Sequence, residues 1–124
     1  MANTALVADN DLLFVEFFGE LLEKRGYRVF KAFNGLEALA QLEGIAMDLF
    51  FVDIYMPELD GREVIRQARE KFSSDEMKII AISGAARQTV EGLDELDFDA
   101  FLQKSPLEKM SKDLDLLMDS LEEG

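Results

Sequence analysis

Four polar side chains stand where short apolar runs of the sequence end: Asp9, Asp53, Ser83 and Lys104. A carboxylate at the end of an apolar run must face solvent, a metal or a partner, because burying it alone costs far more than one strand contributes. Two neighbouring carboxylates with only oxygen partners suit a hard cation, above all Mg²⁺. A serine hydroxyl and a lysine ammonium suit a phosphoryl group. Together the four side chains predict phosphoryl transfer.

An aspartate can itself be the nucleophile of such a reaction, which would give an aspartyl phosphate. The metal would offset the repulsion between that anion and the incoming phosphate, and Lys104 would stabilise charge on the transferred group. Taken singly, these residues are more typical of helix caps, turns and solvated charges. Only their combination at one place favours a site.

The elements that would position these side chains alternate along the chain. Continuous apolar runs predict strands at 5–8, 27–33, 47–53, 78–83 and 100–104. Helical spacing, caps and glycine stops predict helices at 11–26, 34–44, 62–72 and 106–121, and a weaker helix over 86–97 that Gly92 interrupts. Strict alternation predicts an α/β domain with a parallel sheet and right-handed crossovers. Ligands of such sheets collect at the carboxyl ends of the strands, which is where the four side chains fall.

The composition narrows the function further. The 124 residues predict one domain over 1–124, and the lack of cysteine and histidine excludes disulfides, thiolate metal sites and the commonest general base. The net charge of −13 disfavours nucleic acid and anionic membrane as partners and favours cationic ones, although solubility alone would also explain it. No apolar run approaches a membrane span, and no signal peptide is recognisable, so we expect a cytoplasmic protein.

The sequence resembles the receiver domain of two-component response regulators (CheY-like) over essentially its whole length. The motifs that carry the resemblance are "LVADND", "VDIYMPELDG", "AISGA" and "FLQK", in that order. The resemblance implies a flavodoxin-like (βα)5 fold, a doubly wound parallel five-stranded sheet with the strand order 2-1-3-4-5. It also implies that the protein is no enzyme in the usual sense, but a phosphoryl acceptor that assists its own phosphorylation and dephosphorylation.

The resemblance assigns a role to each matching residue. Asp53 would be the phosphoacceptor, and Asp9, Asn10 and the main-chain carbonyl of Tyr55 would join it in binding Mg²⁺. The other implied roles are those of Ser83 as switch hydroxyl, Phe101 as switch aromatic, Lys104 as phosphate-binding lysine, and Met56, Pro57 and Gly61 as the turn after the acceptor.

Three positions depart from the family pattern. Asn10 stands where the family usually has an acid, which predicts weaker Mg²⁺ binding. Asp11 is an alternative acidic ligand, but it is better placed to cap the first helix. Lys104 is followed by Ser105 and only then by proline, which disfavours a cis peptide after the lysine. Phe101 lacks the hydroxyl of the tyrosine often found there, so packing alone would drive its rotation.

Two functions follow from these observations. In the first, a histidine kinase or histidine phosphotransfer protein phosphorylates Asp53, and a conformational change through the face of the fourth and fifth units reaches a downstream effector protein; a homodimer is compatible with this. In the second, which Asn10 suggests, the domain is a phosphorylation-independent (pseudo-receiver) protein–protein interaction module. An aspartate-nucleophile phosphatase would need a carboxylate at Tyr55, and a flavodoxin would need a phosphate loop in place of "DNDLLF". Leu12 and Leu13 precede the apolar stripe of the first helix and are harder to bury, which makes them a candidate docking surface for a kinase partner.

Overall fold

A five-stranded parallel sheet forms the centre of the molecule. The structure is a computed structural model and describes residues 3–123. The strands are β1 (Asn3–Ala8), β2 (Tyr27–Ala32), β3 (Leu49–Asp53), β4 (Lys78–Ser83) and β5 (Ala100–Gln103). The helices are α1 (Leu12–Lys24), α2 (Gly35–Gly44), α3 (Gly61–Lys71) and α4 (Leu107–Glu123), with the short 3-10 turns η1 (Arg87–Thr89) and η2 (Leu93–Glu95).

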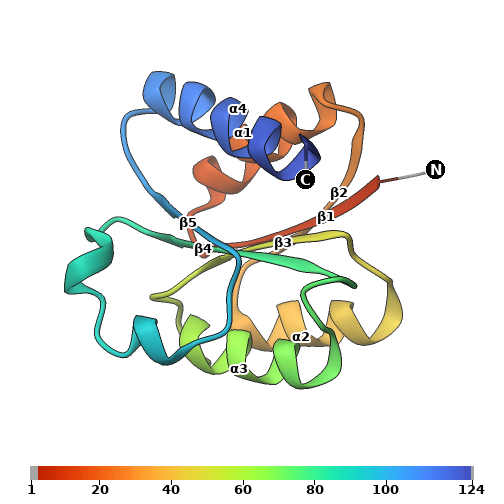
Figure 1. Ribbon diagram of the computed structural model, residues 1–124, viewed down its shortest axis with the longest axis vertical. Coiled ribbons are helices and arrows are strands. Elements are labelled where there is room, and N and C mark those ends of the chain that lie inside the picture. The colour runs from red at the N-terminus through yellow and green to blue at the C-terminus, as the bar shows by residue number, and fades with distance from the viewer. Residues whose placement is uncertain (1–2, 124) are drawn as a thin grey trace.

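The strand order is β2-β1-β3-β4-β5, with every neighbouring pair parallel. Helices α1 and α4 lie on one face of the sheet, and α2 and α3 lie on the other (Figure 1). The predicted doubly wound α/β fold with the order 2-1-3-4-5 is therefore confirmed. Within residues 3–123, no helix is both long enough and apolar enough to cross a membrane.

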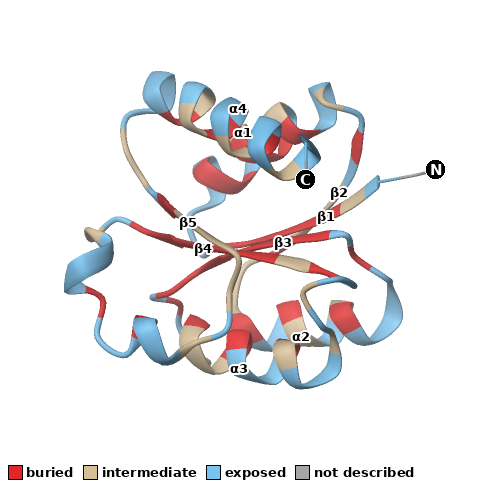
Figure 2. Cartoon of the chain, viewed as in Figure 1, coloured by how far each residue is buried: buried red, intermediate tan, exposed pale blue. Residues whose placement is uncertain are grey.

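The central strand β3 is buried at all five of its residues, as the continuous apolar run "LFFVD" predicts for a strand covered on both faces. Its side chains alternate between two apolar cores. Phe51 packs with the core under α1 and α4, and Phe50 packs with the core under α2 and α3. Burial in Figure 2 follows this layering, with buried residues along the strands and on the inward sides of the helices. Both cores thus fix the strand that ends in Asp53.

Local signals define the helix termini close to the predicted positions. The side chains of Asp11, Asn34 and Asp60 accept hydrogen bonds from backbone N–H groups in the first turns of α1, α2 and α3. Gly26 follows α1 with a left-handed φ of 94°. The expectation that Asp11 serves as a helix cap is confirmed.

The helix predicted over 86–97 is wrong. This segment forms only η1 and η2, separated by Gly92, whose φ is 77°. Val90 and Leu93 are its two buried side chains over that range, which is too few to make the apolar stripe that stabilises a surface helix.

Two arginines of α3 replace part of the hydrogen bonding that a helix would have supplied. Arg62 Nη1 donates to the carbonyl of Glu91 at 2.9 Å, and Arg69 Nε donates to the carbonyl of Asp97 at 3.2 Å. Arg69 also pairs with Asp99 at 2.7 Å, at the entrance to β5. These side-chain donors satisfy backbone carbonyls that have no helical partner. The segment is therefore held against α3 without being helical itself.

In α4, apolar residues at spacings of three and four predict a buried face made of Leu107, Met110, Leu114, Leu117 and Leu121, which is right in its centre and wrong at its ends. Met110 and Leu114 are buried as expected, whereas Leu107 is half exposed. Met118 is fully buried, although the spacing argument did not include it. Leu117 and Leu121 only flank the core, so after Leu114 the buried stripe is shifted by one residue from the predicted one.

Candidate functional site

The four polar side chains at the strand ends are brought to one edge of the sheet. The register pairs Ala8 with Val52, so that Asp9 and Asp53 leave neighbouring strands side by side. The backbone N–H of Lys104 donates to the carbonyl of Ser83 at 2.8 Å and anchors the lysine beside the end of β4. The parallel register alone therefore gathers residues that lie almost a hundred positions apart in the sequence.

The Lys104 ammonium lies across both carboxylates. Its Nζ is 2.5 Å from Asp9 Oδ2 and 3.6 Å from Asp53 Oδ2. The aspartates are almost completely buried, whereas the lysine side chain is 23% exposed. The other oxygen of Asp9 accepts a hydrogen bond from the backbone N–H of Asp11 at 2.9 Å. Two buried anions thus share one cation at the mouth of the site.

The pKa of Asp53 is raised to about 6, from 3.8 in an unperturbed chain. Burial is the main cause, and the negative charge of Asp9 adds to it; the nearby ammonium of Lys104 and the N–H of Tyr55 oppose the rise. Since one lysine cannot neutralise two buried carboxylates, the site has an excess of negative charge. A cation entering the site would relieve that excess.

The donor set fits a magnesium ion, although with few ligands. Among residues 3–123, the buried oxygen Asp9 Oδ2 has no hydrogen-bond partner apart from its ion pair with Lys104, which leaves it open to a cation. Asn10 is exposed beside it, and Asp11 is occupied as the cap of α1, where its Oδ1 accepts from the N–H of Phe14 at 3.2 Å. Over residues 3–123, no three acidic side chains gather as a metal cluster. The site therefore offers two carboxylates and main-chain or amide oxygens, which Mg²⁺ accepts together with water.

Ser83 is fully buried at the end of β4, and its Oγ accepts a hydrogen bond from the N–H of Ala85 at 3.0 Å. Its hydroxyl proton is left to donate elsewhere. Phe101 lies two residues before the end of β5 and packs, partly buried, against the core under α2 and α3. The structure therefore brings Ser83 to the edge with the carboxylates, and places Phe101 further back on the neighbouring strand.

The loop after β3 folds back over Asp53, and Gly61 makes this possible. The N–H of Gly61 donates to the carbonyl of Ile54 at 2.8 Å, and a Cβ at position 61 would lie 2.1 Å from the backbone oxygen of Asp53. Within the loop, Glu58 adopts a left-handed φ of 69°. The sequence match had marked Met56, Pro57 and Gly61 as a turn, but the steric reason for the glycine becomes clear only from the close approach of the backbone.

Sequence reasoning missed two residues near the site. The helical spacing of Phe14, Phe17 and Phe18 predicts core residues, but the Phe14 ring also lies 4.7 Å from Lys104 Nζ. The guanidinium carbon of Arg62 lies 5.2 Å from the centroid of the Tyr55 ring, and Arg62 Nη1 donates a hydrogen bond to the carbonyl of Glu91. Arg62 therefore links Tyr55, two residues after Asp53, with the segment between β4 and β5. The contacts of Phe14 with Lys104 and of Arg62 with Glu91 have no signal in the local sequence, because each joins elements that are distant in the chain.

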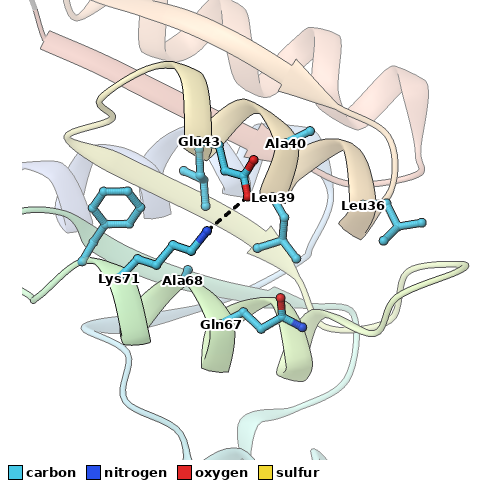
Figure 3. A pocket seen from close by; sticks show the side chains of 9 residues that line it. Leu36, Leu39, Ala40, Glu43, Gln67, Ala68 and Lys71 are labelled. Carbon is cyan, nitrogen blue, oxygen red and sulfur yellow. Dashed lines mark hydrogen bonds and ion pairs between the residues drawn. The ribbon is translucent and has the colours of Figure 1, made fainter.

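A separate surface pocket of about 260 Å³ lies between α2 and α3 (Figure 3). Its walls are mainly apolar, with Leu36, Leu39 and Phe72 among the lining residues. An ion pair of 3.1 Å between Lys71 and Glu43 spans it. None of the residues at the carboxyl edge lines this pocket, so it is distinct from the candidate site.

Solved structures place this fold among the CheY-like receiver domains. The receiver domain from Methylobacillus flagellatus aligns with a TM-score of 0.81 at 27% identity, covering 97% of this chain and 98% of that one. The response regulator protein TrrA from Thermotoga maritima, solved in complex with Mg(2+)-BeF, aligns with a TM-score of 0.77 at 29% identity, covering 93% of this chain and 98% of that one. The class of fold is thus a CheY-like receiver.

The sequence gives the family directly. The response regulator receiver domain model matches residues 5–115, and the chain belongs to this family. Response regulator GtcR from Aneurinibacillus migulanus is 30% identical over 116 residues, which are 90% of this chain and 46% of that protein. The chain therefore spans less than half the length of GtcR.

Proposed function

We propose that this receiver domain is a phosphorylation-driven switch in two-component signalling, with Asp53 as the phosphoacceptor. The observation that carries the proposal is the position of the Lys104 ammonium between two buried carboxylates, 3.6 Å from Asp53 Oδ2 and 2.5 Å from Asp9 Oδ2. The proposed donor is a phosphorylated histidine on a kinase or phosphotransfer protein, and the proposed receiver of the signal is an effector protein. We extend the proposal to a cytoplasmic location.

In the proposed reaction, a carboxylate oxygen of Asp53 attacks the phosphorus of the phosphohistidine. The new P–O bond forms as the P–N bond breaks, and the released imidazole nitrogen takes a proton from solvent. A pKa of about 6 leaves Asp53 ionised in about ten of every eleven molecules at pH 7, so the nucleophile is present in its reactive form. Lys104 would stabilise the negative charge that develops on the phosphoryl oxygens.

Asp9, Asp53, the amide of Asn10 and the carbonyl of Tyr55 would hold the magnesium ion, which when bound supplies positive charge between the nucleophile and the incoming phosphoryl group. The buried and otherwise unpartnered oxygen of Asp9 supports this assignment. The Mg(2+)-BeF complex of TrrA, which belongs to a protein of the same fold, supports it as well.

After transfer, the phosphoryl group would place new negative charge beside Ser83, whose hydroxyl proton is free to donate. Ser83 would move toward it, and Phe101 would repack behind it on β5. The segment 84–99 has no α-helix in this protein, so the switching face consists of η1, η2, β5 and α4. A non-helical segment held by side-chain hydrogen bonds is a reasonable element to rearrange.

The competing function is a phosphorylation-independent interaction module. The presence of only two carboxylates at the site favours it, because each missing anion weakens the attraction for Mg²⁺. In this alternative Lys104 would neutralise the aspartates permanently, and the fold would present a fixed surface.

The experiment that separates the two is intact mass spectrometry after incubation with acetyl phosphate, with and without Mg²⁺. We expect the wild-type protein to gain one phosphoryl group only when Mg²⁺ is present, and Asp53→Asn to gain none. An unmodified wild-type protein at high Mg²⁺, with phosphorylation restored by Asn10→Asp, would instead establish the interaction module. Phosphorylation that persists in Asp53→Asn would contradict the assignment of the acceptor.

A further inference from the structure

The ammonium of Lys104 has a third neighbour besides the two carboxylates. Its Nζ lies 4.7 Å from the centroid of the Phe14 ring, over the face of the ring. Phe14 is on the first turn of α1, whereas Lys104 follows β5, and the ring is 5% exposed. A cation at this distance from an aromatic face is attracted by the negative potential of the ring, and more strongly when the pair is shielded from water.

The ring of Phe14 is held rigidly in place. It stacks on Phe18 with the centroids 5.0 Å apart and an angle of 19° between the planes. Phe18 in turn meets the ring of Phe51 edge-on at 5.0 Å. Phe51 belongs to β3, two residues before Asp53. The face presented to Lys104 is therefore fixed by the strand that carries the acceptor.

The contact with the ring matters because the two ion pairs of Lys104 differ in length. The ammonium is closer to Asp9 than to Asp53, and Asp9 Oδ2 is an oxygen that a cation would claim. A lysine that lost Asp9 would have a flexible four-carbon stem and one remaining carboxylate. An aromatic face attracts the ammonium without binding a proton or a metal ion. It therefore keeps the lysine near Asp53 when Asp9 is occupied.

We propose that Phe14 is a positioning residue: its ring face holds the Lys104 ammonium within reach of the phosphoryl group on Asp53. This inference rests on the proposed function, since it concerns the rate of phosphoryl transfer. The contact itself, however, can be measured in the protein without phosphate or metal.

The decisive perturbation weakens the ring face while leaving its shape nearly unchanged. Phe14 would be replaced by phenylalanine with one, two, three or five fluorine atoms, and phosphorylation by acetyl phosphate would be followed at saturating Mg²⁺. We expect the rate to fall stepwise with fluorine content, by about five- to thirty-fold when the attraction is lost. The rate for Phe14→Leu should be lower by a similar factor. In a protein that already carries Lys104→Ala, the Phe14→Leu substitution should cause no further decrease in the rate.

A matched control is Phe17→Leu, which removes a partly buried ring of the same helix that flanks the same core. It should cost stability without slowing transfer. If Phe14→Leu slows transfer but the fluorinated series does not, the ring acts only through packing and the proposal is overturned. Wild-type rates throughout the fluorinated series would therefore overturn the proposal whatever the effect of Phe14→Leu.

A second measurement keeps this inference separate from the proposed function. In metal-free protein, the Hε protons of Lys104 should be shifted upfield by the ring in an NMR spectrum, and the shift should disappear in Phe14→Leu but not in Phe17→Leu. If the wild-type protein takes up no phosphate, the proposed function fails while this spectrum still tests the contact. An unshifted Lys104 signal in the wild-type protein would overturn the inference.

Discussion

Replacing Asp53 by asparagine should stabilise the folded protein. In the metal-free site, burial and the charge of Asp9 raise the pKa of Asp53 to about 6, from 3.8 in the unfolded chain. Because one pKa unit corresponds to about 1.4 kcal/mol, ionising this carboxyl costs about 3 kcal/mol more in the folded protein than in the unfolded one. Asparagine is uncharged and of nearly the same shape, so Asp53→Asn removes that cost.

The sign of the effect fixes its pH dependence. A carboxyl with a raised pKa in the folded state favours folding below about pH 4, and that contribution is lost as the pH rises through about 6. The difference in unfolding free energy between Asp53→Asn and wild type should therefore grow by about 2.4 kcal/mol from pH 4 to pH 7.5, because the carboxyl of the unfolded chain is already partly ionised at pH 4. At pH 7.5 this corresponds to a midpoint of thermal unfolding that is higher by roughly 10 °C.

The assay is urea unfolding of both proteins in EDTA at several pH values. Asp60→Asn serves as a control of opposite sign, because the Arg62 guanidinium lowers the pKa of Asp60. That pair is partly exposed, so its loss should cost less than about 1 kcal/mol at neutral pH, and the cost should fade toward acid pH. A stability difference for Asp53→Asn that stays constant or shrinks as the pH rises would refute the reasoning, since Lys104 would then outweigh burial and Asp9.

Two further predictions concern the turn after Asp53 and the metal site. Gly61→Ala should destabilise the protein by about 1–3 kcal/mol in urea unfolding, because the added methyl group would meet the backbone oxygen of Asp53. Gly44→Ala is the control, since a methyl group at position 44 has free space and should leave the stability nearly unchanged. Equal effects of the two substitutions would contradict the steric argument. Asn10→Asp should bind Mg²⁺ more tightly in a calorimetric titration, by a factor of about ten to a hundred, because each pair of unit charges at about 4 Å contributes roughly 4 kcal/mol at an effective dielectric of about 20, and desolvation offsets much of that gain. Unchanged affinity would mean that position 10 does not face the ion.

Local pattern was sufficient to predict most of the sheet and the gathering of the site. The run "KIIAIS" predicted β4 with its observed bounds, and the carboxyl ends of parallel strands must share one edge. Asp9, Asp53, Ser83 and Lys104 could therefore be brought together without coordinates. Their roles in phosphoryl transfer remain proposals, which the chemistry of the edge supports.

The segment between β4 and β5 could not be predicted in the same way. Its sequence contains two glycines, Gly84 and Gly92, and few large apolar residues, and propensity alone favours a weak helix over 86–97. Its shape depends on contacts with residues that are distant in the sequence, because Arg62 and Arg69 on α3 donate hydrogen bonds to its carbonyls. The contact between Phe14 and Lys104 escaped prediction for the same reason, since an aromatic residue at helical spacing indicates burial but not which charged group lies over its face.

The substitution at position 10 changes how the remaining charges share the site. Asp9 and Asp53 bring two negative charges and Lys104 one positive charge, so the site with Asn10 has a net charge of about −1 when both aspartates are ionised. An acid at position 10 would double that net charge. With Asn10 in place, Lys104 neutralises half of the carboxylate charge. It does so chiefly at Asp9 Oδ2, which has no other partner in the part of the chain that the structure describes. A cation at that oxygen would displace the ammonium toward Asp53 and the ring of Phe14. Under the proposed function, occupancy of the cation site and the position of the lysine would therefore be coupled, and the lysine would be best placed to act on Asp53 when Asp9 is already engaged.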